Sequence, residues 1–196
     1  MTLWKKGFLR QSIKKTEEGQ LEWITGLFFL LILGILLCGT LQLDVFRASA
    51  VYLEDALAAS NLASAVIDVE EYGISHTILI EDPDRAYEIY LSALQGNLNL
   101  NEEWECPGKG LIGGQVRVLD YIVYNVHEDN VEIYRYDENG LLSYSEGCLG
   151  EVEAPNGKVI EGTGVYSEVT YPVKGIMGVE VQACKANLAD IAVDER

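Results

Sequence analysis

The sequence predicts an α+β protein in which one long N-terminal helix packs on an antiparallel β-sheet. Three observations support this fold class. An uncharged apolar run covers Trp23–Leu43, and the following stretch, Asp44–Tyr72, contains neither proline nor glycine. Beyond Gly73 the chain changes to short runs of β-branched and aromatic residues, separated by segments of turn composition. A long helix followed by a β-rich domain is the simplest structure that fits this order.

Charge gives the chain a direction across a membrane. Residues 1–22 hold five Lys and Arg against three Asp and Glu, a net charge of +2, whereas residues 44–196 hold nine against 28, a net charge of -19. Basic residues beside a membrane span stay in the cytoplasm. We therefore expect residues 1–22 to be a cytoplasmic basic leader and the acidic remainder to be exported. So acidic a surface excludes nucleic acid as a partner.

Residues 23–43 are predicted to be a single transmembrane helix. The run reaches about 31 Å as a helix, which matches the hydrocarbon thickness of a bilayer. Two alternatives are a cleavable secretory signal, for which Ala48-Ser49-Ala50 would be the cleavage site, and a lipoprotein signal ending at Cys38. The run is longer than the apolar part of a usual signal, and Leu37 stands where a lipoprotein has a small residue.

Residues 44–72 are predicted to continue this helix outside the membrane, because alanine is abundant there, and Gly73 is the expected C-cap. Its polar residues form one narrow stripe with a spacing of seven: Arg47, Glu54, Asn61 and Asp68. The apolar remainder requires two partners, one being its own domain and the other a neighbouring copy or a different subunit. The alternative is that its own domain covers the helix completely.

Residues 73–196 are predicted to form one exported α+β domain. A strand is expected at Ile74–Ile80, followed by a helix from Asp82-Pro83 to Leu98, with proline in its first turn. The remaining strands are expected at Gln115–Val126, Val131–Tyr136, Leu141–Tyr144, Gly164–Tyr171 and Val173–Ala183. Pro172 is expected to mark the bend between the last two strands, because proline cannot donate to a β-ladder.

The residues before the membrane run carry a resemblance. Basic Lys14-Lys15, then Gly19, then Glu22-Trp23 is similar to the leader of type IV pilin-like proteins, and residues 163–173 (TGVYSEVTYPV) are similar to the closing strands of TadE-like pseudopilins of the Tad or Flp pilus. The resemblance implies a pilin-like fold and a prepilin peptidase that cuts between Gly19 and Gln20. The mature chain would start at Gln20 if that cut is made and at Met1 if it is not.

Glu22 and Trp23 are the candidate assembly residues. A carboxylate at the edge of the hydrocarbon core must stay at the interface or find a cation. The resemblance implies that this cation is the N-terminus of a neighbouring subunit, and that the partners are other pilin-like subunits and the pilus assembly machinery. Alternatively, Glu22 lies in the headgroup region beside Lys14 and Lys15.

Three cysteines, Cys106, Cys148 and Cys184, lie in the part predicted to be exported, where disulfides persist. Cys106 and Cys148 both lie in turn-rich segments flanking the predicted meander. We expect a disulfide between them, although three cysteines permit three pairings. Cys38, in the membrane run, is interpreted as a small apolar residue.

No residue pattern predicts catalysis. His76 and His127 stand apart from any nucleophile, and no spacing of ligands predicts a metal site or a cofactor. We therefore expect that the chain is not an enzyme. The leading hypothesis is a minor pilin or pseudopilin of a Tad-like pilus, located in the cell membrane or on the cell surface. The alternative is a monomeric, membrane-tethered ectodomain for adhesion or ligand binding.

Overall fold

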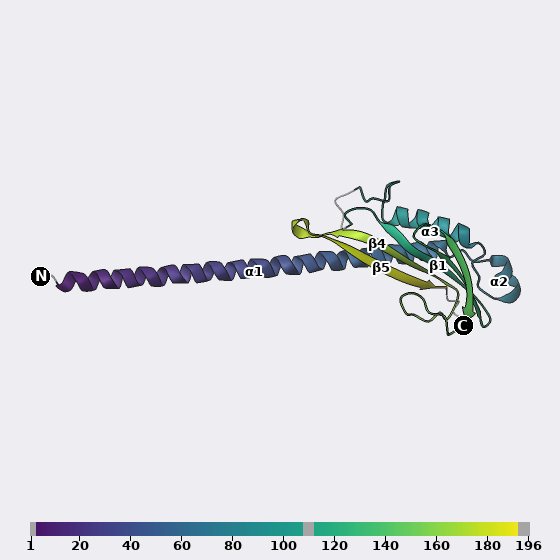
Figure 1. Ribbon diagram of the computed structural model, residues 1–196, viewed down its shortest axis with the longest axis horizontal. Coiled ribbons are helices and arrows are strands. Elements are labelled where there is room, and N and C mark those ends of the chain that lie inside the picture. The colour runs from purple at the N-terminus through teal and green to yellow at the C-terminus, as the bar shows by residue number, and fades with distance from the viewer. Residues whose placement is uncertain (1–2, 108–111, 192–196) are drawn as a thin grey trace. The chain divides into compact units, whose positions relative to one another are not determined.

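The computed structural model describes residues 3–107 and 112–191, with side chains from Glu22 onward apart from Met177. The chain divides into two compact units, Met1–Asp44 and Val45–Arg196, and each is described by itself. Helix α1, Leu3–Ser64, supplies the described part of the first unit and the opening of the second. Figure 1 labels the main elements.

The first unit is helical throughout its described residues. Within residues 23–43 every residue except Gln42 is exposed, and Trp23 retains 83% of its surface. Across the described ranges of the chain, α1 is the one helix long and apolar enough to cross a membrane. The prediction of such an N-terminal helix is therefore confirmed.

The second unit contains a five-stranded antiparallel sheet with the strand order β3-β2-β1-β4-β5. The strands are β1 (Arg117–His127), β2 (Asn130–Tyr136), β3 (Leu142–Cys148), β4 (Gly164–Lys174) and β5 (Glu180–Asp190). The predicted antiparallel meander is confirmed, since β1, β2 and β3 pair in sequence. The α+β fold class is confirmed as well.

Helix α1 ends at Ser64, eight residues before the predicted end at Tyr72. The chain then crosses the segment 65–68, where Ile67 forms a bridge with Ile80, and starts a new helix, α2 (Val69–Ser75). The carboxylate of Asp68 caps α2 by accepting hydrogen bonds from the backbone N–H groups of Glu70 and Glu71, both at 2.9 Å. The predicted single helix to Tyr72 is therefore wrong.

Two further predictions in this region are corrected. Gly73 lies inside α2, and the residue that caps its C-terminus is His76, with a φ of 58°. The predicted strand Ile74–Ile80 does not form, because Ile74 belongs to α2 and only Ile80 makes an isolated bridge. The predicted helix at residues 82–98 is confirmed as α3 (Pro83–Asn97), with Asp82 as its N-cap.

Pro172 does not mark a bend but lies within β4. The β1–β4 pairing ends at Thr170, so Pro172 lies beyond the part of β4 that pairs with β1. On this side Ile112 bridges Val173, and the carbonyl of Pro172 accepts from the N–H of Gly113 at 2.8 Å, a contact for which proline needs no N–H group of its own. The chain turns later, through the short 3₁₀ helix η1 (Ile176–Gly178), and Gly178 adopts a φ of 76° there.

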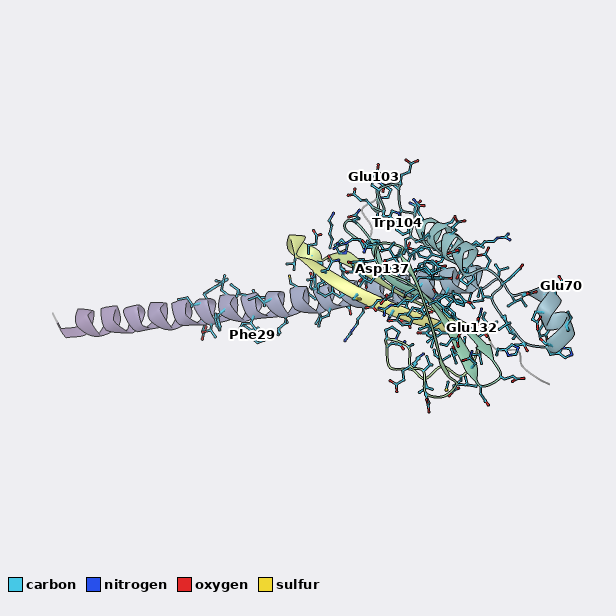
Figure 2. All side chains as sticks on the ribbon, turned by 45° about the vertical axis from the view of Figure 1, so that its right-hand side comes forward. Phe29, Glu70, Glu103, Trp104, Glu132 and Asp137 are labelled. Carbon is cyan, nitrogen blue, oxygen red and sulfur yellow. The ribbon has the colours of Figure 1, made fainter. Side chains whose placement is uncertain are left out.

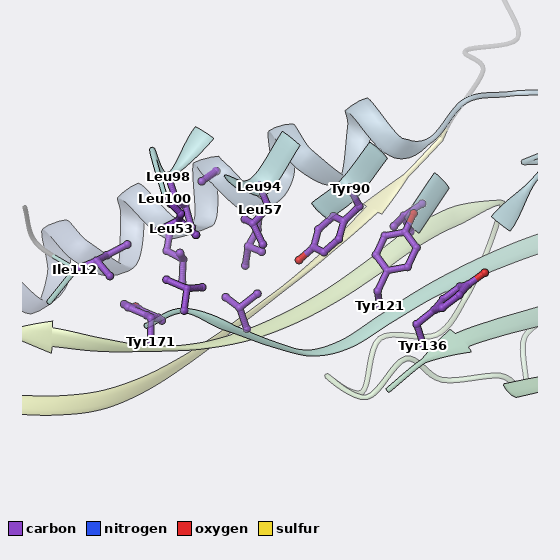
Figure 3. Close-up of a cluster of buried hydrophobic side chains, with 14 of the residues drawn as sticks. Leu53, Leu57, Tyr90, Leu94, Leu98, Leu100, Ile112, Tyr121, Tyr136 and Tyr171 are labelled. Carbon is purple, nitrogen blue, oxygen red and sulfur yellow. The ribbon is translucent and has the colours of Figure 1, made fainter. Parts of the chain in front are cut away.

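The sheet separates two apolar cores. On one face, α1 and α3 cover β1 and β4, and Leu53, Leu57, Tyr90 and Leu94 are fully buried in one cluster with Tyr121 (Figure 3). On the other face the segment after β3 covers the sheet, and its Ala154 and Ile160 pack on three strand residues: Ile122, Tyr124 and Tyr166. Alternating strand residues serve opposite faces, as the pleat requires.

Candidate functional site

The candidate site is the segment of α1 that belongs to the second unit, residues 45–64. Its inner side meets β5 through polar groups. Lys185 Nζ lies 2.7 Å from Glu54 Oε2, and Asn61 Nδ2 donates to the backbone oxygen of Asn187 at 3.1 Å and to its Oδ1 at 3.2 Å. Lys185 and Asn187 are two residues apart and so share one face of β5. Two members of the predicted polar stripe therefore face the sheet.

Two buried hydroxyl groups add to this contact. Ser60 Oγ donates to the carbonyl of Ala56 at 2.7 Å and accepts from Asn97 Nδ2 of α3 at 3.0 Å. Ser64 Oγ accepts from the hydroxyl of Tyr121 on β1 at 2.9 Å. Burial raises the pKa of Tyr121 above its ordinary value, so the phenol stays protonated and keeps donating. These bonds fix the rotation of α1 about its own axis.

The opposite side of the same segment is exposed in the part of the second unit that the structure describes. We call it the outer stripe, and it consists of exposed residues spaced three or four apart: Ala48, Val51, Asp55, Ala59 and Leu62. Val51 keeps 58% of its surface and Leu62 keeps 59%, whereas Leu53 and Leu57 keep none. Asp55 is the only charged member. The described residues of the domain therefore leave this side of the helix uncovered.

The predicted processing and assembly residues lie on the first unit's helix. Gly19 and Gln20 have helical backbone within α1, and their surroundings lie outside the described side chains, as do those of Lys14 and Lys15. Glu22 and Trp23 are exposed. Neither the cut after Gly19 nor a partner for Glu22 is tested by this geometry, so both stay predictions.

The predicted disulfide between Cys106 and Cys148 is not formed, and both thiols are free, as are those of Cys38 and Cys184. Cys106 lies beside Glu105, which bridges Gln115 just before β1, whereas Cys148 pairs with Asn130 at the far end of β1. The length of β1 separates these ends by roughly 33 Å, and a disulfide requires Cα atoms within about 7 Å. Turn composition indicated that both residues flank the meander, but it could not show that they lie at opposite ends of it.

The histidines and acidic residues form no cluster in the part of the chain that the structure describes. His76 ends α2 and His127 ends β1. In the described ranges no three His, Cys, Asp or Glu side chains come together in a way that could hold a metal ion. Figure 2 shows Glu70, Glu103 and Glu132 on different elements of the second unit. The acidic residues are therefore spread over its surface.

The sequence interpretation missed the buried hydroxyl groups on the inner side of α1. Their signal was present, because Ser60 and Ser64 follow Leu53 and Leu57 at helical spacing. Serine is neither a strong helix former nor a core residue, and its recurrence on one apolar face indicates a hydrogen-bonding partner. The partners Asn97 and Tyr121 could not be assigned without the fold.

Comparison with protein-family models, with curated proteins and with solved structures found no match to the chain.

Proposed function

We propose that this chain is a minor pilin or pseudopilin, a structural component of a Tad-like pilus that assembles through its N-terminal helix. The outer stripe carries the proposal. An apolar helix surface exposed on a folded domain marks a contact with another protein or with lipid. In the orientation that the charge asymmetry predicts, residues 45–64 are outside the membrane, so another protein is the partner that fits.

The composition of the outer stripe suits packing against a second helix. Ala48 and Ala59 are small and let another helix approach closely, while Val51 and Leu62 supply apolar surface. Burying one such large side chain contributes about 1.5–3 kcal/mol before the cost of association is subtracted. Weak contacts of this size give stable assembly when many subunits repeat them, as they do along a filament.

The family resemblance supports the same proposal. The leader at Gly19–Trp23 and the closing segment at residues 163–173 are the features that resemble TadE-like pseudopilins. In that family a prepilin peptidase removes the leader, and the exposed apolar run at residues 23–43 then holds the subunit in the membrane before assembly. The size of the chain favours a minor subunit, because the main pilins of that branch are smaller.

Photo-crosslinking in cells tests the proposal. The full chain carries benzoylphenylalanine at Val51 or at Leu62, and the matched control carries it at Glu88, which is exposed on α3. We expect crosslinks from Val51 and Leu62 to a second pilin-like chain and none from Glu88. An uncrosslinked monomer at all three positions would instead support the membrane-tethered ectodomain.

Mass spectrometry of the mature N-terminus gives an independent test. A chain starting at Gln20 supports processing by a prepilin peptidase, because that enzyme cuts after glycine in this family. An intact chain starting at Met1, in cells that process their other pilins, contradicts that part of the proposal. The crosslinks then decide whether an unprocessed chain still assembles.

A further inference from the structure

A cleft lies at the end of the sheet where β1 begins, on elements that do not include α1. It is lined by α3, by the segment leading into β1 and by the β2–β3 turn. Tyr87 and Leu91 are one turn apart on α3 and line one wall. Trp104, in the segment leading into β1, and Val118, in β1 itself, line it as well. The less exposed part of its lining is therefore aromatic and aliphatic.

The aromatic residues are held in place. Trp104 has a φ of 62°, a conformation that costs a non-glycine residue about 1–3 kcal/mol. Two backbone hydrogen bonds keep it there. The N–H of Trp104 donates to the oxygen of Asn101 at 3.1 Å, and the oxygen of Trp104 accepts from the N–H of Val116 at 2.9 Å. The ring of Tyr87 stacks on Tyr136, with centroids 4.4 Å apart and an angle of 14°. The backbone of Trp104 and the ring of Tyr87 are therefore preorganised.

The rim of the cleft is polar and mixed in character. Arg117 can only donate hydrogen bonds, Glu138 can only accept them, and Asn139 and Gln115 carry groups of both kinds. Arg117 and Glu138 are exposed and make no ion pair with any residue that the structure describes. Gln115 Nε2 donates to the backbone oxygen of Glu103 at 3.2 Å. The side-chain oxygen of Gln115 accepts no hydrogen bond from any described donor.

This combination matches one class of ligand. A sugar ring has an apolar face of C–H bonds, which packs against the electron-rich face of an aromatic ring, and a rim of hydroxyl groups that both donate and accept. An anionic ligand fits poorly, because residues 44–196 carry a net charge of -19 and Asp137 and Glu138 lie in the same turn. A purely apolar ligand would leave Arg117 and Glu138 without compensation for lost water.

We infer that the cleft between α3, Trp104 and the β2–β3 turn binds a neutral oligosaccharide. A sugar ring lies against Trp104 and Tyr87, and its hydroxyl groups bond with Arg117 and Glu138. The inference is independent of the pilus proposal, since a tethered monomer would use the same cleft.

Saturation-transfer NMR tests the inference with three neutral probes: chitohexaose, cellohexaose and maltohexaose. The full chain is used in a detergent without a sugar headgroup. We expect saturable binding of at least one probe at millimolar concentration. Fluorescence then locates the probe: with Trp4 and Trp23 replaced by phenylalanine, Trp104 is the only tryptophan left, and its emission should change along the same binding curve.

Variants assign the binding to the cleft. Trp104→Ala should abolish it, and Arg117→Gln should weaken it about ten-fold, the loss of one charge-assisted hydrogen bond. Arg85→Gln, an exposed arginine on α3 outside the cleft lining, is the matched control and should bind normally. Near-ultraviolet circular dichroism checks that each variant is folded.

Three results would overturn the inference. The first is the absence of saturable binding by all three neutral probes. The second is binding that survives both Trp104→Ala and Arg117→Gln, which would place the sugar elsewhere. The third is binding of an anionic oligosaccharide or an apolar peptide, tested in parallel, in preference to every neutral probe.

Discussion

The two sides of α1 between Ala48 and Ser64 differ in what covers them. On the inner side Leu53 and Leu57 are fully buried in the second unit, while on the outer side Val51 and Leu62 keep more than half of their surface. Both sides are apolar, so hydrophobicity alone does not distinguish them. One side of this helix therefore holds its own domain together, while the other side is open to a different molecule.

Polar groups decide which side faces inward. Glu54, Asn61 and Ser64 each have a partner on the sheet, and a helix rotated by one residue, or about 100°, would leave these partners unpaired. Apolar packing tolerates such a rotation much better than hydrogen bonding does. The buried polar contacts therefore determine which residues make up the outer stripe.

Shortening one leucine on each side of α1 should have very different effects on stability. Leu57→Ala leaves a cavity among fully buried residues and should lower the free energy of unfolding of the second unit by about 2–5 kcal/mol. Leu62→Ala, on the outer side, should change it by less than about 0.5 kcal/mol. Urea unfolding of the full chain in detergent, followed by near-ultraviolet circular dichroism, measures both. Equal losses of unfolding free energy in the two variants would show that the inner and outer sides of α1 do not differ in how they are covered.

A smaller effect is expected from the hydrogen bond between Tyr121 and Ser64. Ser64→Ala leaves the buried phenol of Tyr121 without its acceptor and should cost about 1–3 kcal/mol. Tyr121→Phe should cost less, about 0.5–1.5 kcal/mol, because Ser64 Oγ still donates to the oxygen of Asn61 at 2.8 Å.

The double variant Ser64→Ala with Tyr121→Phe measures how strongly the two residues depend on each other. A phenylalanine in place of Tyr121 has no hydroxyl group and needs no acceptor, so combining the two substitutions should cost less than the sum of the single changes. The same urea experiment measures all three proteins. A Ser64→Ala variant that loses no more stability than Tyr121→Phe would show that this bond does not hold α1 against β1.

Much of the fold could be predicted because its signals are local. The strands β1 and β2 are rich in β-branched and aromatic residues, and Asp82-Pro83 starts α3 where a capping residue and proline indicate it. The end of α1 also has a local signal, since Asp68 followed by Glu70 and Glu71 is typical of a new helix start. The abundance of alanine and the lack of glycine concealed it.

Other features depend on contacts that no short segment contains. Pro172 is tolerated within β4 only because β4 extends beyond its pairing with β1. The outer stripe could be recognised as apolar from the sequence, but its exposure depends on which side the sheet takes. The cleft joins Tyr87, Trp104 and Arg117 from three separate segments, so their proximity required the fold.

The ion pair on the inner side of α1 should make the stability of the second unit depend weakly on pH. The hydrogen bond and charge of Lys185 hold the pKa of Glu54 below its usual value of 4.5. The unfolded chain therefore binds this proton more readily than the folded chain does. The stabilisation is complete above pH 4.5 and is lost as the pH falls through the lower pKa of the folded protein.

Glu54→Gln isolates this contribution from the other carboxylates. Asp137, for example, also has a lowered pKa, because the N–H groups of Leu141 and Asn139 bond to it, and it adds acid sensitivity of the same sign. The unfolding free energy of the full chain should fall less steeply below pH 4.5 in Glu54→Gln than in the unmodified protein. The matched control is Asp55→Asn on the outer stripe, where no described cation makes an ion pair, and it should leave the slope unchanged. The effect is small because both partners keep contact with water, and an identical slope in Glu54→Gln would show that Lys185 does not stabilise the inner side.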